Sequence, residues 1–360
     1  MRSAEVRNAA GLRLGYAVKD ERGRVLLAAG TELTSGLCEA LVRRGYMQVY
    51  VLDGIADEVA PQDELATRTR NVATQTARQC FQRLARGEAL PFTNVLESVE
   101  LILADLSNAG GAVLEFACLR SVSDYTYVHS VNVCVYSLLI GQAMGVHGEE
   151  LRALGAGSLL HDVGKVLCAD LVANPNHLTP EEWARMRQHP IDGFEMLRQH
   201  RELHLFAPHI AYQHHERLDG SGYPRGLRGD KILPLARMVA VADVYDAMVA
   251  HRPFTVAKPP HLAMEELRAG AGTLFDDQAV QVFIRRMAIY PSGTPVLLAD
   301  GSVAVVVGQT ATAGAPLVRV LGHSGSVHPV PEDRTASGER AVVEVLNRWP
   351  RWLQNTRPAT

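Results

Sequence analysis

The feature that most constrains how this chain folds is a helical hydrophobic pattern that runs from about residue 62 to residue 290. Apolar residues recur there at spacings of three and four, which is typical of helices that bury one face. The first two stripes consist of Leu65, Val72, Phe81 and Leu84, and of Val95, Val99, Ile102 and Leu106. We expect a mainly α-helical bundle. The two stripes either pack on this bundle, which we favour, or form the seam of a homodimer.

The segments on either side of the helical pattern are shorter and richer in strands. The first predicts a hairpin that turns at Asp20–Gly23, and the second a hairpin that turns at Asp300-Gly301, before a polar stretch over 331–340. The expected strands include Leu14–Val18, Val25–Ala28, Gln48–Leu52, Pro295–Leu298, Val303–Val307, Leu317–Leu321 and Ala341–Leu346. We therefore predict a small α/β module over 1–58, connecting helices over 62–110, a helical domain over 115–290 and a β-rich module over 291–347.

Composition excludes several classes of protein. Hydrophobic residues make up 47% and charged residues 21% of the chain, which is the balance of a globular protein and not of a disordered one. The formal net charge is −3, so no overall positive field attracts nucleic acid or anionic lipid. Five cysteines without a C-x-x-C pair are typical of a reducing compartment. The longest apolar run, Val131–Ile140, is shorter than the roughly 20 residues that span a bilayer. We expect a cytoplasmic protein that binds neither nucleic acid nor membrane.

Histidines and aspartates stand at particular places in the helical pattern. They include two adjacent pairs, His161-Asp162 and His214-His215, and such pairs at helix ends are much rarer by chance than single histidines. In chain order the candidates are His129 in a helix over 126–143, His161-Asp162 at the end of a helix over 149–162 that Gly164 terminates, His189 near the end of a helix that Thr179 caps, His214-His215 at the end of a helix over 204–216, and Asp243 in a helix over 235–250.

Ligands that converge from several helices are the way in which helical bundles build dinuclear metal sites. Imidazole and carboxylate groups without thiolates suit Fe, Mn, Zn or Ni better than Ca or Mg. Two such ions, about 3.5–4 Å apart, acidify a water molecule and hold the attacking and leaving oxygens of a phosphoryl transfer. The alternative is a helical scaffold with incidental histidines, which leaves the two adjacent pairs unexplained.

These residues lie in motifs that resemble a known family. The run His161–Lys165 resembles the signature of the HD phosphohydrolase superfamily, and the run His214–Pro224 resembles the HHExxDGxGYP sequence of its HD-GYP subgroup. Further similar elements, in the family's order and spacing, are Tyr125–Val133, His189-Pro190 with Gly193, Ala242–Ala247 and Gly272–Asp276. The resemblance covers roughly residues 115–290, about half of the chain.

The resemblance implies a phosphodiesterase that hydrolyses cyclic di-GMP to linear pGpG, and it leaves open whether pGpG or GMP is the end product. It implies that one metal is held by His129, His161, Asp162 and Asp243, and that Asp162 bridges to a second metal held by His189, His214 and His215. A bridging hydroxide then attacks phosphorus in line with the departing ribose oxygen. Asp162 and Lys165 are the expected catalytic residues, and Lys165 is also expected to contact a phosphate oxygen.

Three further residues are candidate substrate contacts with open alternatives. Tyr223 either stacks on guanine or only packs its loop. Asp246 either orients a ligand or contacts Arg252, since it lies one helical turn after Asp243. Arg252 is expected at the second phosphate or a guanine edge, and otherwise is an ordinary surface residue.

Two positions depart from the family pattern. Tyr125 stands where members with three metals carry glutamate, so we expect two transition-metal ions, with Fe or Mn favoured. Thr255 stands where the family has a basic residue, which weakens the expected binding of substrate phosphate. The alternatives to a cyclic di-GMP phosphodiesterase are a catalytically silent receptor for cyclic di-GMP and an HD phosphohydrolase for another cyclic dinucleotide.

Overall fold

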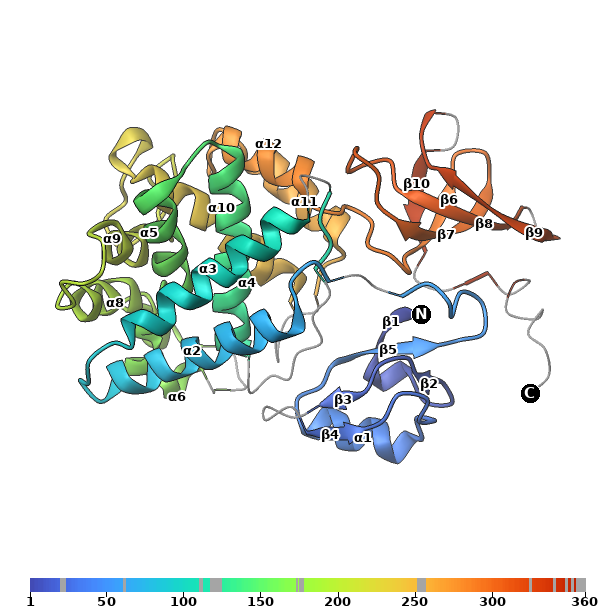
Figure 1. The fold of residues 1–360 in the computed structure, drawn as a ribbon, viewed down its shortest axis with the longest axis horizontal. Helices are drawn as coiled ribbons and strands as arrows, with labels where there is room; N and C mark the ends of the chain where they lie inside the picture. Colours follow the sequence, from blue (N-terminus) through green and yellow to red (C-terminus); the bar gives the residue numbers. More distant parts are fainter. Residues whose placement is uncertain are drawn as a thin grey trace. The chain divides into compact units, whose positions relative to one another are not determined.

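The structure is a computed structural model of the whole chain. It describes all residues except 20–23, 61–62, 110–112, 117–124, 173, 175–177, 251–256, 324–325, 339–340, 347–348, 351–352 and 354–360. The chain divides into two compact units (Figure 1). One consists of Met1–Glu64, Gly111–Asp124 and Arg285–Thr360, and the other of Leu65–Gly110 and Tyr125–Ile284.

The second unit consists of helices, which confirms the predicted mainly α fold. Its longer helices are α2 (Thr67–Ala85), α3 (Phe92–Asn108), α4 (Tyr125–Ala143), α5 (Gly148–Leu159), α8 (His189–Leu197), α9 (Phe206–Gln213), α10 (Pro234–Val249), α11 (Pro260–Gly270) and α12 (Asp277–Arg286), the last of which runs past the unit's end. Shorter pieces are the 3-10 helix η3 (Val163–Cys168), α6 (Ala169–Val172), α7 (Pro180–Met186) and the 3-10 helix η4 (Gly229–Lys231). No described helix is both long and apolar enough to cross a membrane.

Helix α4 is the centre of the helical unit. All of its residues from Val128 to Gly141 are buried, as expected of a helix that is apolar all round. Helices α2, α3, α5 and α10 pack around it. The contacts are close: a methyl group on Gly141 would lie 2.5 Å from a Leu154 methyl carbon, which belongs to α5. Helix α4 therefore holds His129 in the interior of the bundle.

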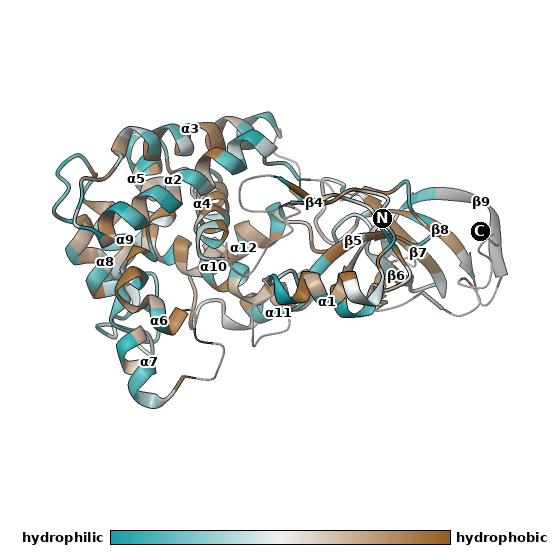
Figure 2. Cartoon of the chain, turned by 90° about the horizontal axis from the view of Figure 1, so that it is seen from below, coloured by the Kyte–Doolittle hydropathy of each residue, from teal (hydrophilic) through white to brown (hydrophobic). Residues whose placement is uncertain are grey.

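Helices α2 and α3 bury their apolar faces within the same unit, in agreement with the favoured expectation and not with a dimer seam. All four predicted α3 residues are buried, and Figure 2 shows hydrophilic and hydrophobic residues along this helix. In α2, Val72 is only half-buried. The buried face of α2 instead includes the smaller Ala73, Ala77 and Cys80. Small side chains let α2 lie close to α4, where polar groups of the two helices also meet.

Several helix ends differ from the prediction, and the differences affect the candidate ligands. Helix α5 ends at Leu159, so His161-Asp162 occupies the turn before η3. Helix α7 ends at Met186, and His189 begins a new helix, α8, because Pro190 suits the first turn of a helix better than its interior. Helix α9 ends at Gln213, with His214 as its C-cap. The Thr179 capping box is confirmed.

The first unit contains two small β structures, and the N-terminal one includes a short helix. Strands β1 (Arg2–Glu5), β5 (Gln48–Leu52) and β2 (Arg13–Leu14) form an antiparallel sheet in that order, with α1 (Ser35–Arg43) and the short 3-10 helix η1 (Val6–Asn8) beside it. The predicted hairpin is formed by β3 (Val18–Lys19) and β4 (Val25–Leu27), while its turn lies outside the described residues. The assignment of Leu14 to this hairpin was wrong, since Leu14 pairs with Val51 of β5.

The C-terminal structure is a five-stranded antiparallel sheet in the order β10-β6-β7-β8-β9. Its strands are β6 (Pro295–Leu298), β7 (Ser302–Gly308), β8 (Leu317–His323), β9 (Ser326–Thr335) and β10 (Val342–Val345). The predicted β6–β7 hairpin is confirmed. Strand β9 was missed because its end falls in the polar stretch 331–340; it is an edge strand, where polar residues are common. The Trp349 indole donates to Asp53 at 2.8 Å and links this sheet's end to the N-terminal module.

Candidate metal centre

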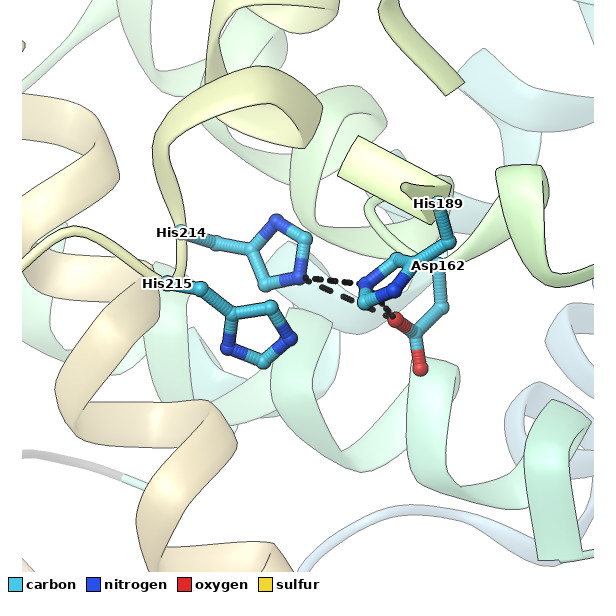
Figure 3. A group of neighbouring side chains, drawn as sticks. All are labelled: Asp162, His189, His214 and His215. Atoms are coloured by element: carbon cyan, nitrogen blue, oxygen red, sulfur yellow. Dashed lines mark hydrogen bonds and ion pairs between the residues drawn. The ribbon is translucent and has the colours of Figure 1, made fainter. Parts of the chain in front are cut away.

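All seven histidines and aspartates predicted as metal ligands converge at one place in the helical unit. They form two groups, in each of which the potential ligand atoms lie within 4.8 Å of one another. The first group is Asp162, His189, His214 and His215, drawn in Figure 3, and the second is His129, His161 and Asp243. The residues come from α4, α8, α10, the end of α9 and the turn after α5. Segments more than a hundred residues apart in sequence thus meet at one point.

Asp162 lies between the two groups, with one carboxylate oxygen facing each. Its Oδ1 atom is 3.2 Å from His189 Nε2 and 3.7 Å from His214 Nε2. Its Oδ2 atom is 3.7 Å from His129 Nε2 and 3.5 Å from His161 Nε2. Only 1% of its side chain is exposed. This is the arrangement of a carboxylate that can bridge two cations.

Backbone carbonyl groups orient three of the histidines. The Nδ1 atoms of His161, His189 and His214 lie 2.7, 2.7 and 2.8 Å from the carbonyl oxygen three residues earlier. A carbonyl only accepts, so each Nδ1 carries the proton and donates it. The Nε2 lone pair of each ring then points to the centre, which is how a hydrogen bond on the far side prepares a histidine to bind a metal.

A carboxylate plays the same part for His129. Its Nδ1 atom lies 2.8 Å from Asp246 Oδ2, and its Nε2 atom is 3.1 Å from Asp243 Oδ1. Asp246 is completely buried and also accepts a hydrogen bond from Asn132 at 2.8 Å. Of the two roles considered for Asp246, the geometry supports the orientation of a ligand.

Burial sets the protonation of most histidines in the centre. Burial lowers the pKa of His161, and it lowers the pKa of His214 and His215 far below the usual histidine value. For His129, burial alone would lower the pKa, but hydrogen bonds to Asp243 and Asp246 outweigh it and the pKa is raised. Neutral imidazoles are the form that binds metal.

The two aspartates are held in their charged form. Burial by itself would raise the pKa of Asp162, yet the positive charge of Lys165, together with the contacts of Asp162 with the neighbouring histidines, keeps it well below the usual value. Burial is likewise outweighed at Asp243, mainly by the hydrogen bond from His129, and its pKa is also well below the usual value. The centre thus offers two carboxylates close to five imidazoles.

The centre fits a divalent transition metal. His161 Nε2 is buried and has no hydrogen-bond partner among the described residues, which leaves a lone pair that a cation would satisfy. The donors are imidazoles and carboxylates without thiolates, a set that suits Fe, Mn, Zn and Ni. The structure and the chemistry together indicate a metal-binding site.

Lys165 and Tyr223 stand at the edge of the centre. Lys165 Nζ lies 2.5 Å from Asp162 Oδ2, and a quarter of its side chain is exposed. The Tyr223 ring packs on His215, with 4.6 Å between ring centroids, and the Arg187 guanidinium lies 5.3 Å from the centre of the Tyr223 ring. Tyr223 therefore packs directly on His215, one of the candidate metal ligands. Its stacking on a guanine base stays a prediction.

The loop that carries Tyr223 is anchored by Glu216, a residue that the sequence reasoning did not single out. The buried Glu216 carboxylate accepts hydrogen bonds from the backbone N–H groups of Arg225 at 2.8 Å and Leu227 at 2.9 Å. A side chain at Gly222 would lie 2.5 Å from the Arg217 nitrogen, so the loop folds tightly on the segment after His215. A glutamate directly after a histidine pair and before a glycine-rich loop was the available signal.

The two positions that depart from the family pattern differ in what is known of them. Tyr125 begins α4, and its ring stacks on His129 at 5.4 Å with an angle of 14° between the ring planes. It therefore lies beside the second group of ligands. Arg252 and Thr255 fall in 251–256, outside the described residues, so the predicted role of Arg252 stays a prediction.

Comparison with known proteins supports the same region. Residues 117–279 match the family model described as HD domain. The chain is 34% identical over 254 residues to the cyclic di-GMP phosphodiesterase PA4108 of Pseudomonas aeruginosa, which covers 70% of this chain and 61% of that protein. It is 42% identical over 153 residues to the cyclic di-GMP phosphodiesterase response regulator RpfG of Xanthomonas campestris, covering 42% and 40%.

Other similar proteins carry related names. The chain is 31% identical over 170 residues to 3'3'-cGAMP-specific phosphodiesterase 3 of Vibrio cholerae, covering 47% of this chain and 37% of that protein. Among solved structures, an HDG"Y"P protein from Bdellovibrio bacteriovorus aligns over 78% of this chain and 97% of its own, with 20% identity and a TM-score of 0.48. The chain thus spans between 37% and 61% of the length of the three relatives named here.

A helical unit whose histidines and aspartates surround a shared carboxylate has the donor set of a metal-binding domain. The family model and the sequence relatives describe it more closely: residues 117–279 match the HD domain model, and the chain is similar to relatives that are named as cyclic di-GMP phosphodiesterases.

Proposed function

We propose that this protein is a metal-dependent phosphodiesterase that hydrolyses cyclic di-GMP to linear pGpG, with either pGpG or GMP as the end product. The observation that carries the proposal is Asp162, whose two oxygens face two separate groups of histidines. Hydrolysis of a phosphodiester needs an activated water and compensation of phosphate charge at one point. The names of the relatives from Pseudomonas aeruginosa and Xanthomonas campestris support the choice of substrate.

The proposed cofactor is a pair of transition-metal ions, with Fe or Mn favoured. His129, His161, Asp162 and Asp243 would hold one ion, and His189, His214, His215 and the other oxygen of Asp162 would hold the second. Two bound cations would acidify a water molecule and neutralise charge on the phosphate. Tyr125 offers no carboxylate beside His129, which supports two ions and not three.

The protein's own groups bind and orient the substrate in this proposal. Lys165 is partly exposed and points its ammonium group at the centre, so it is placed to contact a non-bridging phosphate oxygen as negative charge develops. Tyr223, which packs on His215, and the Arg187 guanidinium over its ring would contact the substrate beside the first group of ligands. Asp246 would act behind His129, as the acceptor of its Nδ1 hydrogen bond.

The decisive experiment is hydrolysis of several cyclic dinucleotides by the full chain, with Mn²⁺ or Fe²⁺ added and products separated by chromatography. We expect cyclic di-GMP to be consumed, and Asp162→Ala or His161→Ala to abolish the reaction. His147→Ala, which changes an exposed histidine, is the matched control and should retain activity. Full activity in Asp162→Ala would overturn the assigned mechanism. Metal-loaded protein that binds cyclic di-GMP without cleaving it would favour the receptor alternative.

A second candidate substrate is 3'3'-cGAMP. It is favoured by the similarity of the chain to a phosphodiesterase of Vibrio cholerae that is named as specific for this dinucleotide. The same assay separates the two candidates by the ratio of kcat/KM for the two substrates.

A homodimer and a cytoplasmic location stay predictions; chromatographic size determination tests the first.

A further inference from the structure

A continuous series of hydrogen bonds leads from helix α2 to the metal centre. Arg70 of α2 donates from Nη1 to Asn132 Oδ1 of α4 at 2.9 Å. Asn132 donates from Nδ2 to Asp246 Oδ1 of α10 at 2.8 Å. The other oxygen of Asp246 accepts from His129 Nδ1 at 2.8 Å, and His129 Nε2 faces Asp243 at 3.1 Å. Three helices are thus linked to one candidate ligand.

The residues in this series of hydrogen bonds are well protected from water. Asn132 is 3% exposed, Asp246 is 0% exposed and His129 is 2% exposed, while Arg70 is half-buried. Hydrogen bonds are stronger in such an environment, and an unpaired polar group there is costly. Breaking one link therefore leaves a buried group that must find a new partner by moving.

Because of the chemistry of the Asn132 amide, Arg70 affects every later hydrogen bond in the series. A guanidinium only donates hydrogen bonds and a carboxylate only accepts them, so the amide between them has one orientation that satisfies both. The charge of Arg70 fixes Oδ1 toward α2 and Nδ2 toward Asp246. Asp246 is then held with its second oxygen on His129 Nδ1, which sets the tautomer and the ring plane of His129.

We propose that Arg70 is a positioning residue for the metal centre and acts on His129 through Asn132 and Asp246. The inference rests on the proposed function, since it assigns His129 as a ligand. It also extends the site beyond residues 117–279, which match the family model, because α2 precedes them. Arg70 lies in the first turn of α2, so a displacement of that turn changes the support of His129.

The test is the affinity of the metal-free, full-length protein for Mn²⁺, measured by calorimetry without substrate. Arg70→Met keeps an unbranched apolar stem but donates no hydrogen bond, and should weaken binding at one of the two sites by about 3- to 10-fold. Asp246→Asn removes the direct partner of His129 and should weaken it by about 10- to 100-fold, the range for groups that orient metal ligands. Arg68→Met changes an exposed arginine on the same helix and should bind Mn²⁺ as the wild type does.

A double variant distinguishes positioning from a general loss of stability. If Arg70 acts through Asp246, Arg70→Met should add nothing to the effect of Asp246→Asn, because the series of hydrogen bonds is already interrupted. Arg70→Lys keeps one donor and should restore affinity to within about twofold of the wild type.

Three results would overturn the inference: wild-type Mn²⁺ affinity in Arg70→Met, a lower melting temperature of that variant without weaker binding, or additive effects in the double variant. If Arg70→Met does not fold, Asn132→Ala interrupts the same series of hydrogen bonds without a change in α2. Wild-type Mn²⁺ affinity in Asn132→Ala would equally overturn the inference. Hydrolysis assays remain separate. Wild-type protein that binds Mn²⁺ but hydrolyses no cyclic dinucleotide would refute the proposed function and leave this inference standing.

Discussion

Gly164 of η3 lies directly against the backbone of His189 at the start of α8. A methyl group on Gly164 would overlap the His189 carbonyl oxygen and would stand 2.6 Å from the Gly193 nitrogen. The sequence suggested that Gly164 ends a helix; the structure shows that its missing side chain lets η3 and α8 touch. This close approach brings Asp162, at the start of η3, to within 3.2 Å of His189.

Gly164→Ala is therefore expected to destabilise the protein and weaken its metal centre. Overpacking of a tight interior contact costs about 1–3 kcal/mol, and the contact here is with backbone that has little room to move. Thermal unfolding and Mn²⁺ titration measure the two effects. Gly36→Ala is the control, because Gly36 is an exposed helical glycine with nothing near it and alanine should be neutral or slightly stabilising there. Equal melting temperatures of the wild type and Gly164→Ala would contradict the prediction.

Replacement of Lys165 by methionine is expected to lower kcat far more than it lowers stability. Loss of one group that stabilises developing charge typically costs on the order of 10²-fold in kcat. The Lys165 ammonium group is close enough to the centre to have this role, at 2.5 Å from Asp162. Steady-state hydrolysis of cyclic di-GMP is the measurement, with the exposed Lys231→Met as its control. An unchanged kcat would assign Lys165 to the support of Asp162 alone.

The metal-free protein is expected to lose stability as the pH falls from about 7 to about 5. His161, His214 and His215 have a pKa below the ordinary value of 6.5 in the folded state, mainly because they are buried. As the pH falls through 6.5, the unfolded chain takes up protons first, so the unfolded state gains in stability. The melting temperature, measured with a chelator present, should fall over this range.

His129 opposes this trend but does not reverse it. Its pKa is raised, so its contribution is present below the ordinary histidine value and is lost as the pH rises through the folded-state value. One residue acts against three. His214→Gln should have a flatter pH dependence than the wild type, whereas a wild-type melting temperature that rises on acidification would refute the assignment of neutral histidines.

Glu216→Gln is expected to loosen the loop that carries Tyr223. The amide has one oxygen and one NH₂ group where the carboxylate has two acceptors, so one of the N–H groups of Arg225 and Leu227 loses its partner. An unmade buried hydrogen bond costs about 1–3 kcal/mol. KM for the dinucleotide should rise while kcat changes less. Glu181→Gln, at an exposed position on α7, serves as the comparison, and an equal KM in both variants would disprove the role of Glu216.

The helical class and the set of residues that converge could be predicted without the structure. Periodicity identified α3 correctly, because a helix with one buried face repeats its apolar residues at a fixed spacing. The capping box at Thr179 and the β6–β7 hairpin are also local features, decided by a few neighbouring residues. The adjacent pairs His161-Asp162 and His214-His215 stood out for their chemistry alone.

The division of these residues into two groups around Asp162 was expected from the family resemblance, and the tertiary structure adds which atoms each residue presents. Spacing along the chain does not encode which groups of different helices meet, so the link from Arg70 through Asn132 and Asp246 to His129 had no signal in sequence. The helix end near His161 differs from the prediction because long-range packing at Gly164 holds η3 against α8, whereas the start of α8 at His189 follows from the local preference of Pro190 for a first turn. The residue types that can bind a metal are visible in the sequence, whereas their relative positions depend on contacts between segments that are far apart in the sequence.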